Sequence, residues 1–351
     1  MLLRDRIAQE ISEHGGWISF ARYMELALHA PGLGYYATGT EVLGAHGDFV
    51  TAPELGSLFG RTLARQLRDV DHHKILELGA GSGALAETLL KELSCEYFIL
   101  ETSAALRERQ RERLGSRVRF IDRLPERWRG IVLANEVADA MPVQVVGWTK
   151  QGIVERGVGV IEDQFAWSER PATGQLLGEA RSIHVPVPYV SELGLAARAW
   201  MRTLCERLDE GLILVIDYGF PRHEYYHPQR SGGTLMCHYR HQAHADPFLR
   251  PGEEDITAHV DFSALAAAAR ETGVPVLGYA TQAQFLVNCG ITDVLGEANA
   301  ENALHYAPIA AQAQKLLSPA EMGELFKVLA VGRGVEQRLL GFSRGDRSDA
   351  L

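Results

Sequence analysis

The sequence lacks most features that mark membrane, secreted and nucleic-acid-binding proteins. Its 351 residues include only 4 cysteines, far apart and without a CxxC pair, so neither a disulfide framework nor a zinc module is expected. No stretch approaches the roughly 20 apolar residues of a membrane span. Its 35 basic and 45 acidic residues give a net charge of −10, which disfavours nucleic acid as a partner because phosphate binding needs a basic surface. A basic protein segment would suit this charge better.

The N-terminal residues also lack targeting signals. They contain no long apolar core of a signal peptide, and Asp5, Glu10 and Glu13 argue against an acid-poor transit peptide. Together with the scattered cysteines, these absences favour a cytoplasmic protein in a reducing compartment.

What the chain does have is an alternation of short apolar strands with helices from residue 74 onward. The strands read "KILELG", "EYFILET", "VRFID" and "GIVLANE", which predicts an α/β fold with a Rossmann-like sheet and helices on both faces. After residue 143, "VQVVGW", "GIVERGVGVI" and "QFAWSER" predict an antiparallel insertion. We therefore expect an N-terminal helical and loop region over 1–70, a Rossmann-like domain over 71–142 and 192–340, and a β-rich insertion over 143–191.

The first of these strands runs into a glycine turn, "ILELGAGSGAL". Gly79 and Gly81 let the backbone approach a ligand, and Gly83 or Ala84 lets the next helix pack on the sheet. The turn also satisfies the dinucleotide pattern GxGxx[GA], so a nicotinamide or flavin site is the alternative. Glu77 separates the two cases because its carboxylate would repel a pyrophosphate but attract the ammonium and sulfonium groups of S-adenosyl-L-methionine. The predicted cofactor is S-adenosyl-L-methionine.

Two more carboxylates come after strands of the same sheet. Glu101 closes the second strand, at the place where an acceptor for the ribose hydroxyls is expected, and Asp122 ends the third. Asp122 has two interpretations, a contact to the adenine amino group or a solvated carboxylate. Glu77 and Glu101 could also serve only as helix or turn partners.

The chain resembles a known family over about residues 18–332. The motifs are "GYY", "GDFVTAPELGSLFG", "ILELGAGSGAL", "LETSAALRERQ", "LANEVADAMPV", "VIDYG", "PGEEDITAHVDFSAL" and "TQAQFLVNCGI", which are similar to those of the MidA / complex I assembly factor methyltransferases. This resemblance implies a class I enzyme that methylates arginine on a protein, with the 49 kDa-type quinone-module subunit of respiratory complex I as partner. Eukaryotic members are mitochondrial, so a chain without a targeting sequence is expected to be bacterial and cytoplasmic. Oligomeric state stays open, with a homodimer among the options.

An arginine acceptor indicates which residues to consider for substrate binding. Guanidinium is a planar, charged fork that carboxylates bind through paired hydrogen bonds. Glu136 is the predicted clamp, Asp139 the second carboxylate and Asn135 an orienting group, all after the fourth strand. Asp217 ends the fifth strand in the same way, with substrate contact or a local turn as its two interpretations. A helix cap is the alternative for Asp139, and a structural role is the alternative for Glu136.

Three further points stay open from the sequence. By resemblance, Thr51 and Glu54 lie over the cofactor; alternatively, Thr51 caps a helix and Glu54 completes a capping box. A histidine-rich run contains Cys237, His238, His241 and His244, but we expect no metal there and expect instead a loop that contacts the target protein or covers the site. Rival functions are a non-catalytic assembly chaperone that binds S-adenosyl-L-methionine, and a small-molecule methyltransferase.

Overall fold

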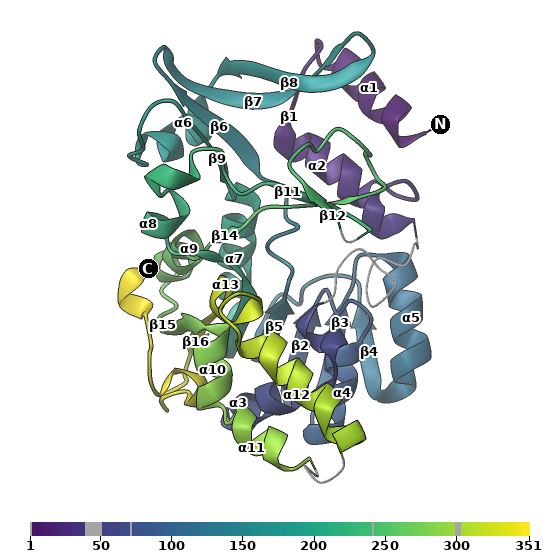
Figure 1. The fold of residues 1–351 in the computed structure, drawn as a ribbon, viewed down its shortest axis with the longest axis vertical. Helices are drawn as coiled ribbons and strands as arrows, with labels where there is room; N and C mark the ends of the chain where they lie inside the picture. Colours follow the sequence, from purple (N-terminus) through teal and green to yellow (C-terminus); the bar gives the residue numbers. More distant parts are fainter. Residues whose placement is uncertain (1, 39–50, 71, 241, 299–302) are drawn as a thin grey trace.

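The computed structural model describes residues 2–38, 51–70, 72–240, 242–298 and 303–351 (Figure 1). Its main sheet has the order β15-β16-β10-β5-β2-β3-β4, in which only β16 runs against its neighbours, and β14 pairs with the end of β10. These strands are β2 (Lys74–Leu78), β3 (Glu96–Leu100), β4 (Val118–Ile121), β5 (Trp128–Asn135), β10 (Leu208–Phe220), β14 (Val260–Asp261), β15 (Val276–Thr281) and β16 (Phe326–Arg333).

The central strands are apolar on both sides because helices cover both faces of the sheet. In β5 and β10, Ile131, Leu212 and Leu214 pack on one side, and the alternate residues Val132 and Ile213 pack on the other. The first side is covered by α3 (Ser57–Arg68), α4 (Ala84–Glu92), α10 (Gln282–Asn288), α11 (Ile291–Gly296) and α12 (Ala303–Leu317), the second by α7 (Leu195–Arg207) and α9 (Phe262–Glu271). The predicted Rossmann-like α/β fold is confirmed.

A second, antiparallel sheet lies at the opposite end of the molecule (Figure 1). It contains β1 (Ile18–Ser19), β6 (Gln144–Thr149), β7 (Gly152–Ile161), β8 (Gln164–Pro171) and β9 (Tyr189–Leu193), with α6 (Gly174–Arg181) between the last two. The antiparallel insertion is therefore present. A short strand from the N-terminal segment also joins this sheet, because Ile18 and Ser19 pair with Val158 and Gly157 of β7.

The N-terminal helices pack between this sheet and a small three-stranded one. The helices α1 (Leu3–Glu13) and α2 (Phe20–His29) share a core with Val145, Val158, Cys237 and Ile256. The small sheet has the order β12-β11-β13. Its strands are β11 (Met236–Tyr239), β12 (Gln242–His244) and β13 (Asp255–Thr257).

The remaining elements are helical. They are α5 (Ala104–Leu114), α8 (Arg222–Tyr225) and α13 (Met322–Leu325), and the 3-10 helices η1 (Tyr35–Ala37), η2 (Ala52–Leu55), η3 (Gly115–Arg117), η4 (Pro228–Arg230), η5 (Leu340–Phe342) and η6 (Ser348–Ala350). Within the described ranges, no helix combines the length and the hydrophobicity needed to cross a bilayer.

Candidate active site

A pocket opens at the carboxyl ends of β2, β3 and β5. Its empty space is about 930 Å³, part of which is open to solvent. Strand order reverses between β2 and β5, and open α/β sheets bind ligands at such a crevice. The predicted site residues in its wall are Thr51, Glu54, Glu77, Gly79, Gly81, Glu101, Asn135, Glu136 and Asp139. The fold thus brings most of the predicted residues into one pocket.

The glycine turn leaves β2 in a backbone conformation that favours glycine. Gly79 and Gly81 have φ values of 63° and 54°, and a Cβ atom on Gly79 would meet Val137 at 3.1 Å. Before the turn, Glu77 is 2% exposed and accepts a 2.8 Å hydrogen bond from the hydroxyl of Tyr97. Burial raises the pKa of Glu77 to about 7 despite this bond, and the charge of Glu101 adds to the rise. A cation in the pocket would therefore stabilise the ionised form of Glu77.

Glu101 is held in the wall by two donors. Its Oε1 accepts the backbone N–H of Ser103 at 2.9 Å, and its Oε2 accepts the side-chain amide of Gln110 at 3.0 Å. The same amide donates to the carbonyl of Gly81 at 2.8 Å, so Gln110 ties the glycine turn to Glu101. Burial raises the pKa of Glu101, and these donors oppose the rise. Sequence patterns do not single out Gln110, because it lies on a helix rather than at the end of a strand.

The segment after β5 carries the predicted acceptor-binding residues. Glu136 has a φ of 54°, which is rare for a residue other than glycine and is typical of sites where strain is kept for function. Its Oε1 accepts from the Asn135 amide at 3.2 Å and from the backbone N–H of Ala52 at 3.4 Å. Asp139 is 7% exposed, and its Oδ2 accepts from the Tyr218 hydroxyl at 2.5 Å.

Both carboxyl groups ionise less readily than they would in water. Burial, and then the charge of Asp139, raise the pKa of Glu136 to about 8, and burial raises the pKa of Asp139 to about 6. Asp139 Oδ1 and Asn135 Oδ1 are buried and have no hydrogen-bond partner among the described residues. These two acceptors favour a ligand rich in N–H donors.

Asp217 lies beneath this segment and is not among the described residues that line the pocket. It is fully buried, and its Oδ2 accepts the backbone N–H groups of Val137, Ala138 and Asp139 at 3.2, 2.9 and 3.3 Å. Burial and the nearby carboxylates of Asp139 and Glu136 raise its pKa well above the usual value. Its place is that of a positioning residue for the loop that presents Asp139.

Two other predicted residues, Gly83 and Asp122, lie near the glycine turn and the end of β4, and Glu54 of the pocket wall contacts the turn. Gly83 is the N-cap of α4 with φ 81°, and a Cβ atom there would meet Leu114 of the neighbouring helix α5 at 3.2 Å, so its role in packing α4 on the sheet stays a prediction. Asp122 is 84% exposed at its side chain and pairs with Arg107 at 2.5 Å; it is not among the described pocket residues, and its contact with adenine stays a prediction. Glu54 accepts a hydrogen bond from the hydroxyl of Ser82 in the glycine turn.

Two cap alternatives are wrong. Thr51 makes no side-chain cap bond, and it precedes the 3-10 helix η2, which has Pro53 in its first turn. The segment after Asp139 consists of turn and bend residues before β6, so Asp139 caps no helix.

The N-terminal region supplies two pocket residues that the sequence did not predict. His29 ends α2 and Tyr36 belongs to η1; their rings stack with centroids 5.5 Å apart, and both line the pocket. Tyr36 donates to Asp255 of β13 at 2.9 Å, and burial lowers the pKa of His29. Tyr36 belongs to the "GYY" motif, but it lies far from the main sheet along the chain, so its place in the pocket could not be predicted.

The residues present fit S-adenosyl-L-methionine. Carboxylates at Glu77 and Glu101 are buried where a cationic amino acid end and ribose hydroxyls can meet them, and the turn around Gly79 leaves room for close approach. Two unpartnered acceptors remain at Asn135 and Asp139 for a second, donor-rich group.

Comparisons with known proteins agree with this geometry. The sequence profile of a family of S-adenosyl-L-methionine-dependent methyltransferases matches residues 58–280. The mitochondrial protein arginine methyltransferase NDUFAF7 of Danio rerio is 31% identical over 90% of this chain and 83% of its own, and the Drosophila melanogaster homologue is 30% identical over 91% and 82%. A crystal structure from Burkholderia thailandensis, bound to S-adenosyl-homocysteine, is 48% identical with a TM-score of 0.96, and covers 99% of this chain and 96% of that one.

Proposed function

This chain belongs to the S-adenosyl-L-methionine-dependent methyltransferases, and we propose that it methylates an arginine side chain of a protein. The acceptor identity is supported by the relatives named as protein arginine methyltransferases. It is also supported by the carboxyl groups of half-buried Glu136 and buried Asp139 in the cofactor pocket. The first substrate to test is the 49 kDa-type quinone-module subunit of complex I, which the motif resemblance suggested. A bacterial cytoplasm is the proposed location, in line with four free cysteines.

The observation that carries this proposal is the pair of unpartnered buried acceptors beside two carboxyl groups with raised pKa values. A guanidinium brings several N–H donors and a permanent positive charge, so it would satisfy Asp139 Oδ1 and Asn135 Oδ1 and favour ionised Glu136. A neutral hydroxyl acceptor would leave the carboxyl groups without a counter-charge.

Bound S-adenosyl-L-methionine supplies the methyl group from its sulfonium, whose sulfur keeps the electron pair of the broken bond. The protein's work is to hold the guanidinium nitrogen in line with that bond and to exclude water. Glu136 and Asp139 would orient the fork, and Asp217 would hold the backbone between them. The nitrogen loses one proton as the new bond forms, and a carboxylate with a pKa near neutrality, such as Asp139, can accept it.

The test uses the full-length protein, labelled S-adenosyl-L-methionine and the purified candidate subunit, with the modified peptide mapped by mass spectrometry. Label on an arginine supports the proposal, and label elsewhere or none contradicts it.

Glu136→Gln should lower kcat by about 10²-fold or more while the affinity for S-adenosyl-homocysteine stays within about threefold, because the clamp acts on the acceptor. Glu155→Gln, on a strand of the antiparallel sheet, is the matched control and should behave as wild type. A normal rate in Glu136→Gln would place the clamp elsewhere.

A further inference from the structure

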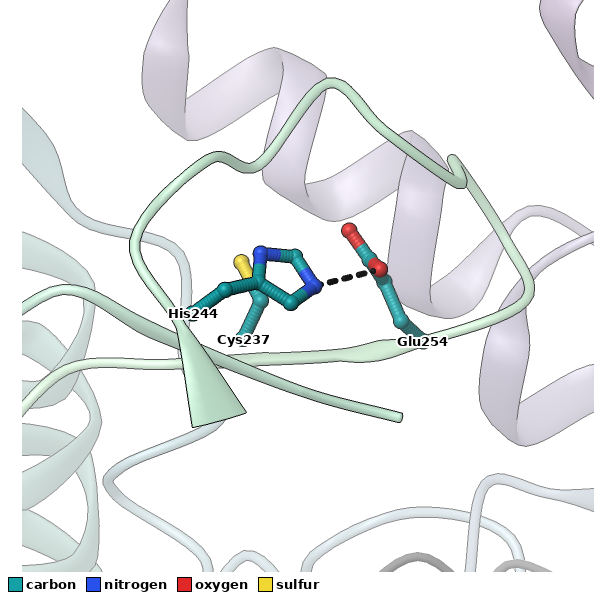
Figure 2. A group of neighbouring side chains, drawn as sticks. All are labelled: Cys237, His244 and Glu254. Carbon is teal, nitrogen blue, oxygen red and sulfur yellow. Dashed lines mark hydrogen bonds and ion pairs between the residues drawn. The ribbon is translucent and has the colours of Figure 1, made fainter. Parts of the chain in front are cut away.

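The small three-stranded sheet places a thiol, an imidazole and a carboxylate on one face. Cys237 in the central strand β11 pairs directly with His244 of β12 and with Ile256 of β13. Glu254 lies two residues before Ile256, and residues two apart in a strand direction share a face. Figure 2 shows the ring of His244 between the Cys237 thiol and the Glu254 carboxylate.

These three side chains are close, buried and incompletely bonded. One ligand atom from each lies within 4.8 Å of the others, and His244 Nε2 is 3.0 Å from Glu254 Oε2 (Figure 2). Cys237 and Glu254 are fully buried, whereas the side chain of His244 is 23% exposed. His244 Nδ1 and Glu254 Oε1 are buried without a hydrogen-bond partner in the described part of the chain.

We propose that Cys237, His244 and Glu254 bind a divalent transition-metal ion of the zinc class. Sulfur, nitrogen and oxygen ligands at Zn–S of about 2.3 Å and Zn–N or Zn–O of about 2.0–2.2 Å require ligand atoms roughly 3.3–3.6 Å apart in a tetrahedron. The cluster therefore needs shifts of only about 1 Å to close on an ion. A thiolate and a carboxylate would neutralise its two charges, and the half-open side at His244 leaves a fourth position for water.

The plain alternative is an ion pair between His244 and Glu254, supported by Arg250 at 3.8 Å from the same Oε2. That arrangement gives no role to the neighbouring thiol and leaves one inward atom of His244 and one of Glu254 unused. An ion bound by the thiol, one ring nitrogen and one carboxylate oxygen would give each of the three residues a role. The sequence did not predict this metal site, because Glu254 lies ten residues after His244 and comes close to it only through the pairing of strands. His241, from the same histidine-rich run, lies outside the described residues.

The proposed ion would sit behind the cofactor pocket. Next to Glu254, Asp255 turns to the other face of the sheet and accepts the hydroxyl of Tyr36, which lines the pocket. A metal that fixes Glu254 would therefore also hold the strand that positions Tyr36. Its role is structural, and the proposal does not depend on the identity of the methyl acceptor.

The experiment measures metal on the untagged, full-length protein. Zinc content after dialysis is expected to be about one equivalent per chain, and Co²⁺ added to the metal-free protein should give the near-ultraviolet band of a thiolate ligand. Cys237→Ser should abolish that band. Cys237→Ser and His244→Asn should each weaken zinc affinity at least about 100-fold, since losing only a supporting partner of a ligand costs about 10- to 100-fold. Cys205→Ser, which removes another buried thiol, should change neither.

Three results would contradict the proposed metal site. They are a zinc content below a tenth of an equivalent with no thiolate band, a thiolate band that persists in Cys237→Ser, and a loss of zinc affinity in Cys205→Ser equal to that in Cys237→Ser. His244→Asn guards against misfolding because this side chain is partly exposed, and an unchanged far-ultraviolet circular dichroism spectrum would show that it is folded. Zinc should also raise the Tm of the wild-type protein but not that of His244→Asn.

Discussion

Glu136 combines two unfavourable features: a left-handed backbone conformation and a carboxyl group whose ionised form the surroundings disfavour. Its pKa of about 8 in the fold lies above the ordinary value of 4.5, so between these values the folded chain binds more protons than the unfolded one. The free energy of unfolding must therefore fall as pH rises through this window, and the penalty is complete above about pH 8. This is the pattern of a residue kept for function at the expense of stability.

We expect Glu136→Gln to be more stable than wild type at pH 8.5, by roughly 1–3 kcal/mol, and close to wild type at pH 5. The estimate lies below the full value of the pKa shift because the side chain is partly exposed to the pocket. Urea denaturation of both proteins without ligand at the two pH values measures the difference. An equal difference at both would mean that its origin is not the charge of Glu136.

Glu101 offers a second test at the level of one residue. Glu101→Ala is expected to weaken binding of S-adenosyl-homocysteine at least about 100-fold, since hydrogen bonds to a charged group contribute about 1.5–3 kcal/mol each. Calorimetric titration measures the affinity. Glu96→Ala removes a carboxylate from the other, exposed end of β3, and should leave it unchanged. If Glu101→Ala binds normally, the ribose assignment is wrong.

At the scale of elements, the loop after β5 depends on the neighbouring strand β10. Asn135 pairs with Ile216, so the next residue of β10, Asp217, comes under the backbone N–H groups of Val137 to Asp139. Asp217→Ala would leave three N–H donors in a buried place without an acceptor.

We expect Asp217→Ala to lower the free energy of unfolding by about 3 kcal/mol or more and to reduce methyl transfer more than cofactor affinity. The split between kcat and S-adenosyl-homocysteine affinity checks this, because a residue with only a general role in stability would lower neither in folded protein. Asp217→Asn, which keeps an oxygen for these donors, should recover part of the rate. No recovery would argue that Asp217 acts by its charge.

The elements also show what the sequence can predict. The strands at Ile75, Ile99 and Ile131 were predictable because buried parallel strands are short apolar runs, and the carboxylates at their ends had to meet at one edge of the sheet. His29, Tyr36 and the contact of Asp217 were not predictable in this way. Their places depend on how separate elements pack and on the register between β5 and β10, neither of which leaves a local pattern.

At the scale of the whole molecule, three parts of the structure build and support the pocket. The main sheet supplies Glu77 and Glu136, the N-terminal segment supplies Tyr36, and the small sheet holds Tyr36 through Asp255. The antiparallel sheet shares a core with α1 and α2 and so supports the segment that reaches the pocket. The part of the pocket wall that contains Tyr36 therefore depends on packing between elements outside the main sheet.

The net charge of −10 gives this assembly a long-range preference for a basic partner. If the acceptor is an arginine within a basic segment, kcat/KM should fall on the order of 10-fold between 0.1 and 1 M NaCl, since the screening length shrinks from about 10 Å to 3 Å. The value of kcat should change much less, because the buried contacts of Glu136 and Asp139 are poorly screened. A peptide with the same arginine but acidic flanking residues should show the opposite trend in kcat/KM. Salt dependence that is the same for both peptides would mean that the acceptor is bound without electrostatic steering.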